Sequence, residues 1–194
     1  MHLRIRVEQI VVETFSVVLG ILLALAANAW HDSVVHGTQA RDALRNIRAE
    51  IAANRASLTE KLSYHSAMRD SLAALVARTH TASVPGGLQA VHGWDGIHPA
   101  RVVDNAWLTA GATGAMQYIP FAVVLPLSKT YELQQRVVDM QRAFYSVVYT
   151  PQFAVGGVAA IASMSSFLGD LAVNERQLVE QYDIALRDSS AAPR

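Results

Sequence analysis

Residues 10–30 have the sequence IVVETFSVVLGILLALAANAW, and the architecture of the chain follows from them. No residue from Thr14 to Trp30 is charged, and Glu13 is the one charged residue before them in this stretch. A helix of about 20 mostly apolar residues matches the hydrocarbon core of a bilayer. Trp30 stands at the end, where an amphipathic ring favours the headgroup layer. The stretch predicts a transmembrane anchor at 10–30, preceded by a tail at 1–9.

Two other structures give a similar pattern. Ala27-Asn28-Ala29 has the small-x-small form of a signal-peptidase site. A signal peptide, however, begins with a positive region, and here Arg4 and Arg6 are balanced by two glutamates. A buried helix of a soluble core is the second alternative, but such helices seldom run this long without a charge. The sequence therefore favours an uncleaved anchor.

The charges on the two sides of the span give the orientation. Arg4 and Arg6 precede the span, whereas three arginines follow it at a greater distance, so the positive-inside rule is nearly balanced. A short tail before a first span usually stays in the cytoplasm. We expect a single-pass protein of a bacterial inner membrane, with a cytoplasmic N-terminus and a periplasmic body.

One side of the span carries small and polar residues at steps of four: Ser16, Gly20, Ala24 and Asn28, with Glu13 one turn earlier. Helices in lipid associate through close backbone approach and side-chain hydrogen bonds, because hiding leucine from lipid gains nothing. The pattern favours a helix–helix seam and hence a homo-oligomer. Glu13 and Asn28 leave an alternative open, in which copies of the anchor surround a conduit.

The extramembrane domain, residues 31–188, has helical periodicity. A long helix is expected at 38–78, because apolar residues recur at steps that sum from threes and fours. These residues are Leu44, Ile47, Ile51, Leu58, Leu62, Leu72 and Leu75. Glycine and proline then predict a loop at 79–99.

Three further helices are expected in the rest of the chain. They cover about 100–118, about 120–149 and about 158–187, and a polar tail at 189–194 follows. Residues 153–168 also lack charge, and either a buried bundle helix or a membrane-embedded segment explains them. The expected fold is all-α: a transmembrane helix, a long helix and a helical bundle.

Bulk composition excludes several function classes. The formal net charge is zero, so no long-range field attracts nucleic acid. The chain has no cysteine, which removes disulfides, thiol catalysis and zinc–thiolate sites. It has neither a Gly-x-Ser-x-Gly motif nor a phosphate-binding glycine loop. We expect no enzyme and no cofactor.

Three groups of side chains are candidates for chemistry, and each has a simpler explanation. His80, His92, Asp95 and His98 contain metal-ligand types, but their spacing matches no ligand motif. The second group, Asp32 and His36, lies one helical turn apart beside His31 at the membrane boundary, where a solvated interface explains it. The third group is aromatic and is explained by core packing: Tyr131, Phe144, Tyr145, Tyr149 and Phe153.

The anchor as a whole resembles that of a family of uncharacterised bacterial membrane proteins of about this length. The shared pattern is E-x6-G-I-L-x-A-L-x2-N-x-W, which begins here at Glu13 and ends at Trp30. The resemblance extends to the helix at 43–54, to Ala106-Trp107 and to the segment 127–132. It implies the same architecture and no reaction, and it gives His31 no role.

These observations predict a membrane-anchored structural or interaction protein. Its expected partners are the lipid bilayer, further copies of itself and a periplasmic protein. The alternative is a small oligomeric channel or transport component.

Overall fold

The computed structural model describes residues 2–80, 83–148, 150 and 157–188. Within these residues all regular structure is helical and no strand occurs, which confirms the all-α prediction. The described residues contain four α-helices, α1, α2, α3 and α5, and two short 3-10 helices, η1 and η2.

Helix α1 runs without a break over His2–Arg78, which is 77 residues or about 115 Å of helix. The polar junction at 31–37 does not interrupt it. Thr38 and Arg41 each donate a side-chain hydrogen bond to a carbonyl one turn earlier, at 2.9 and 3.1 Å. Residues 2–9, which the sequence suggested as a separate tail, are part of the same helix.

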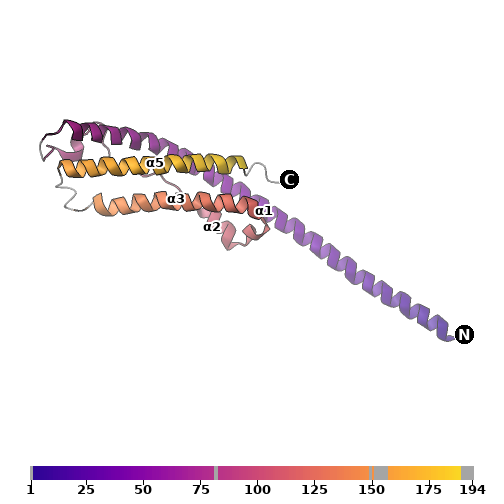
Figure 1. The fold of residues 1–194 in the computed structure, drawn as a ribbon. Coiled ribbons are helices and arrows are strands. Elements are labelled where there is room, and N and C mark those ends of the chain that lie inside the picture. The colour runs from indigo at the N-terminus through magenta and orange to yellow at the C-terminus, as the bar shows by residue number, and fades with distance from the viewer. Residues whose placement is uncertain (1, 81–82, 149, 151–156, 189–194) are drawn as a thin grey trace.

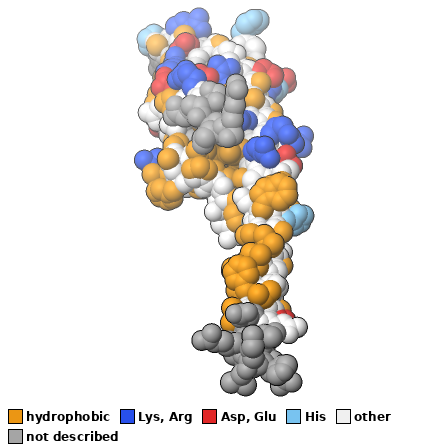
Figure 2. All heavy atoms as spheres, turned by 90° about the vertical axis from the view of Figure 1, so that its right-hand side faces the viewer, with side chains coloured by type: hydrophobic (Ala, Val, Ile, Leu, Met, Phe, Trp, Pro, Cys, Tyr) orange, Lys and Arg blue, Asp and Glu red, His pale blue; other side chains and the backbone are white. Residues whose placement is uncertain are grey.

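The two halves of α1 have different surroundings. Residues 9–35 are exposed all round and project from the body as a single helix (Figure 1). Hydrophobic side chains cover this projecting stretch, whereas charged side chains gather over the body (Figure 2). Among the described residues, α1 is the one helix that is long and apolar enough to cross a membrane.

The body is built from the second half of α1 together with α3, Phe121–Val148, and α5, Val158–Asp188. Helix α3 runs in the same direction as α1, and α5 runs back between them toward the projecting stretch (Figure 1). The three helices lie side by side because each buries one apolar stripe against the others.

An irregular return segment, described at residues 79–80 and 83–104, connects the far end of α1 to the near end of the body (Figure 1). It contains the short η1, Gly87–Ala90. The sequence predicted a loop at 79–99, and the irregular structure continues five residues further. Val91, Ile97 and Ala100 are buried, so this segment is packed against the bundle rather than standing free.

The predicted helix at 100–118 is wrong in detail. The structure forms α2, Asn105–Ala112, and then η2, Ala115–Tyr118. Gly114 separates them with a φ of 75°, a left-handed conformation that glycine adopts at little cost. A Cβ atom at this position would also lie 2.8 Å from the side-chain nitrogen of Gln117. Apolar periodicity alone does not reveal such a break.

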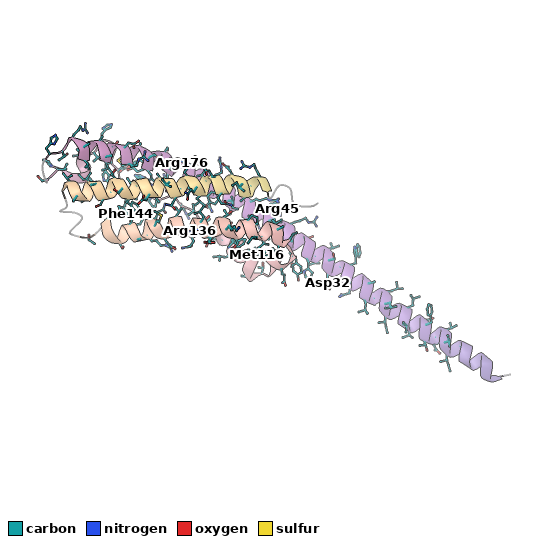
Figure 3. All side chains as sticks on the ribbon, viewed as in Figure 1. Asp32, Arg45, Met116, Arg136, Phe144 and Arg176 are labelled. Atoms are coloured by element: carbon teal, nitrogen blue, oxygen red, sulfur yellow. The ribbon has the colours of Figure 1, made fainter. Side chains whose placement is uncertain are left out.

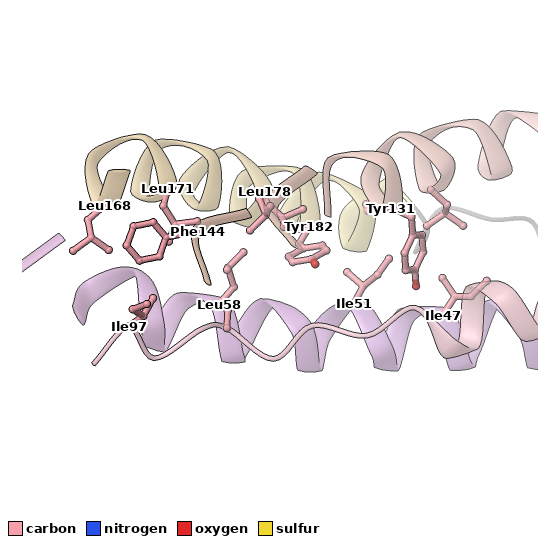
Figure 4. Packing of buried hydrophobic residues seen from close by; sticks show 14 of the residues in the cluster. Ile47, Ile51, Leu58, Ile97, Tyr131, Phe144, Leu168, Leu171, Leu178 and Tyr182 are labelled. Carbon is pink, nitrogen blue, oxygen red and sulfur yellow. The ribbon is translucent and has the colours of Figure 1, made fainter. Parts of the chain in front are cut away.

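The core lies where the three long helices meet. Leu58 of α1 lies opposite Leu178 and Tyr182 of α5 (Figure 4). Nearer the start of the body, Ile51 and Ile47 of α1 lie on the side of Tyr131 of α3 (Figure 4). Ile97 of the return segment covers one side of the core near Leu58 (Figure 4). Of the seven predicted stripe residues, two are half-buried, Leu62 and Leu75; the other five are buried.

The uncharged segment 153–168 divides into two parts. Residues 153–156 lie outside the described residues. Residues 158–168 form the start of α5, where Ile161, Met164 and Leu168 are at most 1% exposed inside the body. The described part of this segment is therefore a bundle helix.

Candidate functional site

The predicted seam residues all lie on the projecting stretch of α1 and are all exposed: Glu13, Ser16, Gly20, Ala24 and Asn28. Asp32 lies at the end of this stretch nearest the body, and its side chain is already clear of the bundle (Figure 3). Ser16 donates to the carbonyl of Val12 at 2.8 Å, and the amide of Asn28 donates to Asp32 at 3.1 Å. A Cβ atom at Gly20 would meet nothing within 4 Å. This face is therefore open to a second helix.

The direction of this face follows from helical geometry. At 3.6 residues per turn, the seam points roughly opposite to the core stripe of Leu44, Ile47 and Ile51. The body thus lies on one side of α1, and the small-residue face lies on the opposite side.

Two boundary residues predicted as a pair have other partners. The sequence places Asp32 and His36 one helical turn apart, close enough to contact each other. Asp32 instead accepts from Asn28, and His36 stacks on Tyr118 with ring centroids 3.9 Å apart. His36 therefore joins α1 to η2 at the point where the body begins.

A groove of about 710 Å³ lies between α1 and α2. Its lining is mostly small or polar: Gln39, Asp42, Ala43, Asn46, Glu50, Val103, Asn105, Ala106, Thr109, Ala110, Thr113 and Ala115. Glu50 accepts from the hydroxyl of Tyr131 at 2.7 Å and from the backbone N–H of Ala106 at 2.8 Å. Asp42 pairs with Arg45 at 2.8 Å. Both carboxylates of the groove thus have partners.

Glu50 also explains the protonation of the tyrosine beside it. Burial, then the hydrogen bond and negative charge of Glu50, raise the pKa of Tyr131 far above its usual range. Tyr131 therefore stays a hydroxyl and acts as a donor at any physiological pH. The contact joins α3 to α1.

A buried amide network crosses the middle of the core. Asn54 donates to Gln134 at 3.0 Å, and Tyr182 donates to the same Gln134 oxygen at 2.6 Å. Asn54 also bonds both backbone groups of Val103, donating to the carbonyl at 2.7 Å and accepting from the N–H at 3.0 Å. Four chain segments meet here, and their polar groups satisfy one another, as buried polar groups must.

A buried ion pair lies further from the anchor. His65 and Glu175 have no exposed side-chain area, and Nδ1 of His65 is 2.8 Å from a Glu175 oxygen. The other ring nitrogen, Nε2, lies 2.7 Å from the carbonyl of Ile97. An imidazolium donates through both nitrogens and satisfies both contacts. Gln141 donates to Glu175 at 3.5 Å.

The protonation of His65 follows from competing effects. Burial alone would lower the pKa of His65, since it penalises the charged ring. The hydrogen bond and negative charge of Glu175, with the carbonyls of Ile97 and His98, outweigh burial and raise that pKa above 6.5. Neither residue lines the groove. With no exposed area, the pair holds α1, α5 and the return segment together and has no substrate access.

The sequence did not single out these buried clusters. A signal was present, because Asn54 and His65 occupy stripe positions seven residues from Ile47 and Leu58. Their partners lie as far as 110 residues away in the chain. No spacing rule connects residues at such a separation.

The predicted metal candidates do not come together. Asp95 and His98 interact within the return segment, where Nε2 of His98 lies 3.3 Å from the carboxylate. Across the part of the chain that the structure describes, no group of three or more potential metal ligands occurs. Tyr131 and Phe144 of the aromatic run are core residues, and Tyr145 is half-buried. Tyr149 and Phe153 lie outside the described residues.

Comparisons with protein-family models, curated proteins and solved structures give no match in any of the three. The resemblance of the anchor pattern to an uncharacterised family therefore stays a prediction. Function has to be argued from the geometry of α1 and the body.

Proposed function

We propose that this protein is a membrane-anchored structural or interaction protein that forms a homo-oligomer through its anchors. The projecting stretch of α1 carries the proposal, because it is apolar, exposed all round and separate from the body. Soluble monomers rarely expose apolar patches larger than a few hundred Å². A bilayer removes this surface from water, and about 20 residues suffice to cross it.

The continuity of α1 supports a mechanical role for the anchor. The same helix forms the span and one wall of the body, so the body is held at a fixed direction relative to the span. A flexible tether would leave the body free to tumble above the bilayer. A continuous helix instead presents the groove between α1 and α2 at a set height, where a periplasmic partner can reach it.

The seam face supports self-association. It is open at Gly20, and it points away from the body. Close backbone approach and interhelical hydrogen bonds from Asn28 and Glu13 supply the attraction, at about 1 kcal/mol per bond. In this proposal the N-terminus is cytoplasmic and the body periplasmic, as a short tail before a first span favours.

Cysteine labelling tests the anchor and its orientation, because the native chain has no cysteine. Gln135→Cys places one thiol on the exposed surface of the body. In intact spheroplasts, a membrane-impermeant maleimide should label this thiol, and the protein should stay in the membrane after alkaline washing. Labelling only after lysis would show that the body is cytoplasmic. Release of the protein by the wash would contradict a membrane anchor. A mature N-terminus at Trp30 would show that the apolar stretch is a cleaved signal peptide.

The conduit alternative is tested separately. Purified protein in a planar bilayer is expected to show no unitary conductance. Discrete openings that Glu13→Gln alters would favour the channel instead.

A further inference from the structure

The body carries an apolar corner at its end nearest the projecting stretch. The corner consists of Tyr118, Phe121 and Leu125, which are 40%, 74% and 41% exposed. Phe121 is more exposed than any other large hydrophobic side chain described, including those of the projecting stretch. In Figure 2, which views the body from the side of that stretch, hydrophobic side chains gather along its lower edge.

The corner is fixed against α1 rather than loosely attached. Tyr118 stacks on His36 at 3.9 Å with the rings within 10° of parallel. The neighbouring Ala115 and Ile119 are buried in the body. His36 lies six residues beyond Trp30, which is about 9 Å along a helix. The corner therefore stands just outside the predicted end of the span.

The exposed stripe of α3 changes character with distance from the anchor. It begins with Phe121 and Leu125, and continues through Ser128 to Glu132 and Gln135. All five side chains are exposed, so burial in the body does not explain why only the first two are apolar. The change matches a bilayer surface that covers the first turns of α3 and leaves the rest in water.

We propose that this corner is a second membrane contact, seated in the headgroup layer of the leaflet from which α1 emerges. The proposal rests on the membrane anchor proposed above. The interfacial layer extends roughly 5–7 Å beyond the hydrocarbon core, and spans tilt on average by about 20°. A tilt of α1 toward the corner lowers Phe121 into this layer, where aromatic rings are favoured. Two contacts, the span and the corner, then fix the tilt of the body.

The direction of the corner favours lipid over a second copy of the chain. Tyr118 contacts α1 on its body side, whereas the seam points roughly opposite. When two anchors pair through the seam, their corners face outward into free membrane. Each corner then meets lipid and not the neighbouring protomer.

Fluorophore depth measurements test the contact, again with single cysteines in the full chain. Phe121→Cys and Leu125→Cys report on the corner. Gln135→Cys, on the same stripe about 21 Å further along α3, is the matched control, and Leu19→Cys reports on the span. Each variant is labelled with a polarity-sensitive dye and reconstituted into phosphatidylcholine vesicles with nitroxide on the upper acyl chain.

If the corner contacts lipid, dyes at residues 121 and 125 should show blue-shifted emission and strong quenching by the lipid nitroxide. The dye at residue 135 should show neither effect, and the dye at residue 19 should be quenched. Aqueous emission at 121 and 125, with quenching at 19, would overturn the second contact and keep the anchor. A lack of quenching at 19 would overturn the anchor and the contact together. If dyes at residues 121 and 125 are shielded from both the lipid nitroxide and aqueous iodide, the second membrane contact is also overturned. That result would indicate that protein covers the corner.

Discussion

At the residue scale, the contact between His65 and Glu175 determines how the stability of the body depends on pH. The folded state raises the pKa of His65 above its ordinary 6.5. The folded protein therefore holds this proton more tightly than the unfolded chain does. The corresponding stability is fully present below the unfolded pKa and is lost as pH rises through the folded pKa.

The first prediction follows from the raised pKa of His65 in the folded state. Raising the pH from about 6 to about 9 should lower the thermal midpoint of the detergent-solubilised protein, because neutral His65 leaves Glu175 as a buried charge without a counter-charge. The His65→Gln variant should be less stable at low pH and should lose this part of the pH dependence. An identical slope in both proteins would contradict the assignment.

Helix α1 contains a second glycine, Gly37, which is half-buried and lies outside the predicted seam. Gly37 lies inside the helix, and a Cβ atom there would meet nothing within 4 Å. The second prediction is that Gly37→Ala stabilises α1 by about 0.5–1 kcal/mol, because alanine loses less backbone entropy than glycine in a helix. Amide hydrogen exchange around residues 34–41 should slow. Faster exchange would show that α1 bends at this junction.

At the element scale, the part of α1 that could be predicted is the part with a regular pattern. The span is recognisable by its length and lack of charge, and the stripe of Leu44, Ile47 and Ile51 by its helical period. Neither pattern requires knowledge of a packing partner. The sequence does not decide whether these two parts are continuous, since the polar residues at 31–37 suit either a break or an exposed helix.

The elements that the sequence did not predict depend on single residues or distant partners. Gly114 divides the region predicted as one helix, because one left-handed residue ends α2. The return segment reaches residue 104 because Asn54 of α1 holds both backbone groups of Val103. Apolar periodicity carries no information about either feature.

The third prediction tests how α1 packs. Ile51→Asp should destabilise the body by several kcal/mol, because Ile51 is 1% exposed and an unpaired carboxylate would be buried there. Ala52→Asp is the matched control, since the neighbouring position is exposed. Chemical denaturation should separate the two variants clearly. Equal midpoints would mean that this face of α1 is not buried.

At the scale of the whole molecule, the apolar surfaces are divided between two environments. The core stripe of α1 faces α5 and α3, while the projecting stretch and the corner at Phe121 remain uncovered by protein in one chain. We propose that lipid and a second anchor cover these surfaces. Glu13 and Asn28, predicted from the sequence as seam or conduit residues, remain candidates for contacts between copies.

The fourth prediction concerns assembly. Gly20→Ile should lower the oligomer order in mild detergent, because a bulky side chain on the seam holds two helices apart. Val18→Ala, on the opposite face of the span, should leave the particle unchanged. Size-exclusion chromatography with light scattering measures both. If both variants keep the wild-type size, the bodies rather than the anchors hold the assembly together.

The most direct test of the central claim is disulfide scanning of the span in native membranes. Single cysteines at Gly20, Ala24, Val18 and Leu22 compare the seam with the opposite face in a chain that has no other thiol. The account predicts oxidised dimers from Gly20→Cys and Ala24→Cys and few from Val18→Cys and Leu22→Cys. Equal cross-linking at all four positions, or cross-linking only at 18 and 22, would contradict an anchor that pairs through its small-residue face.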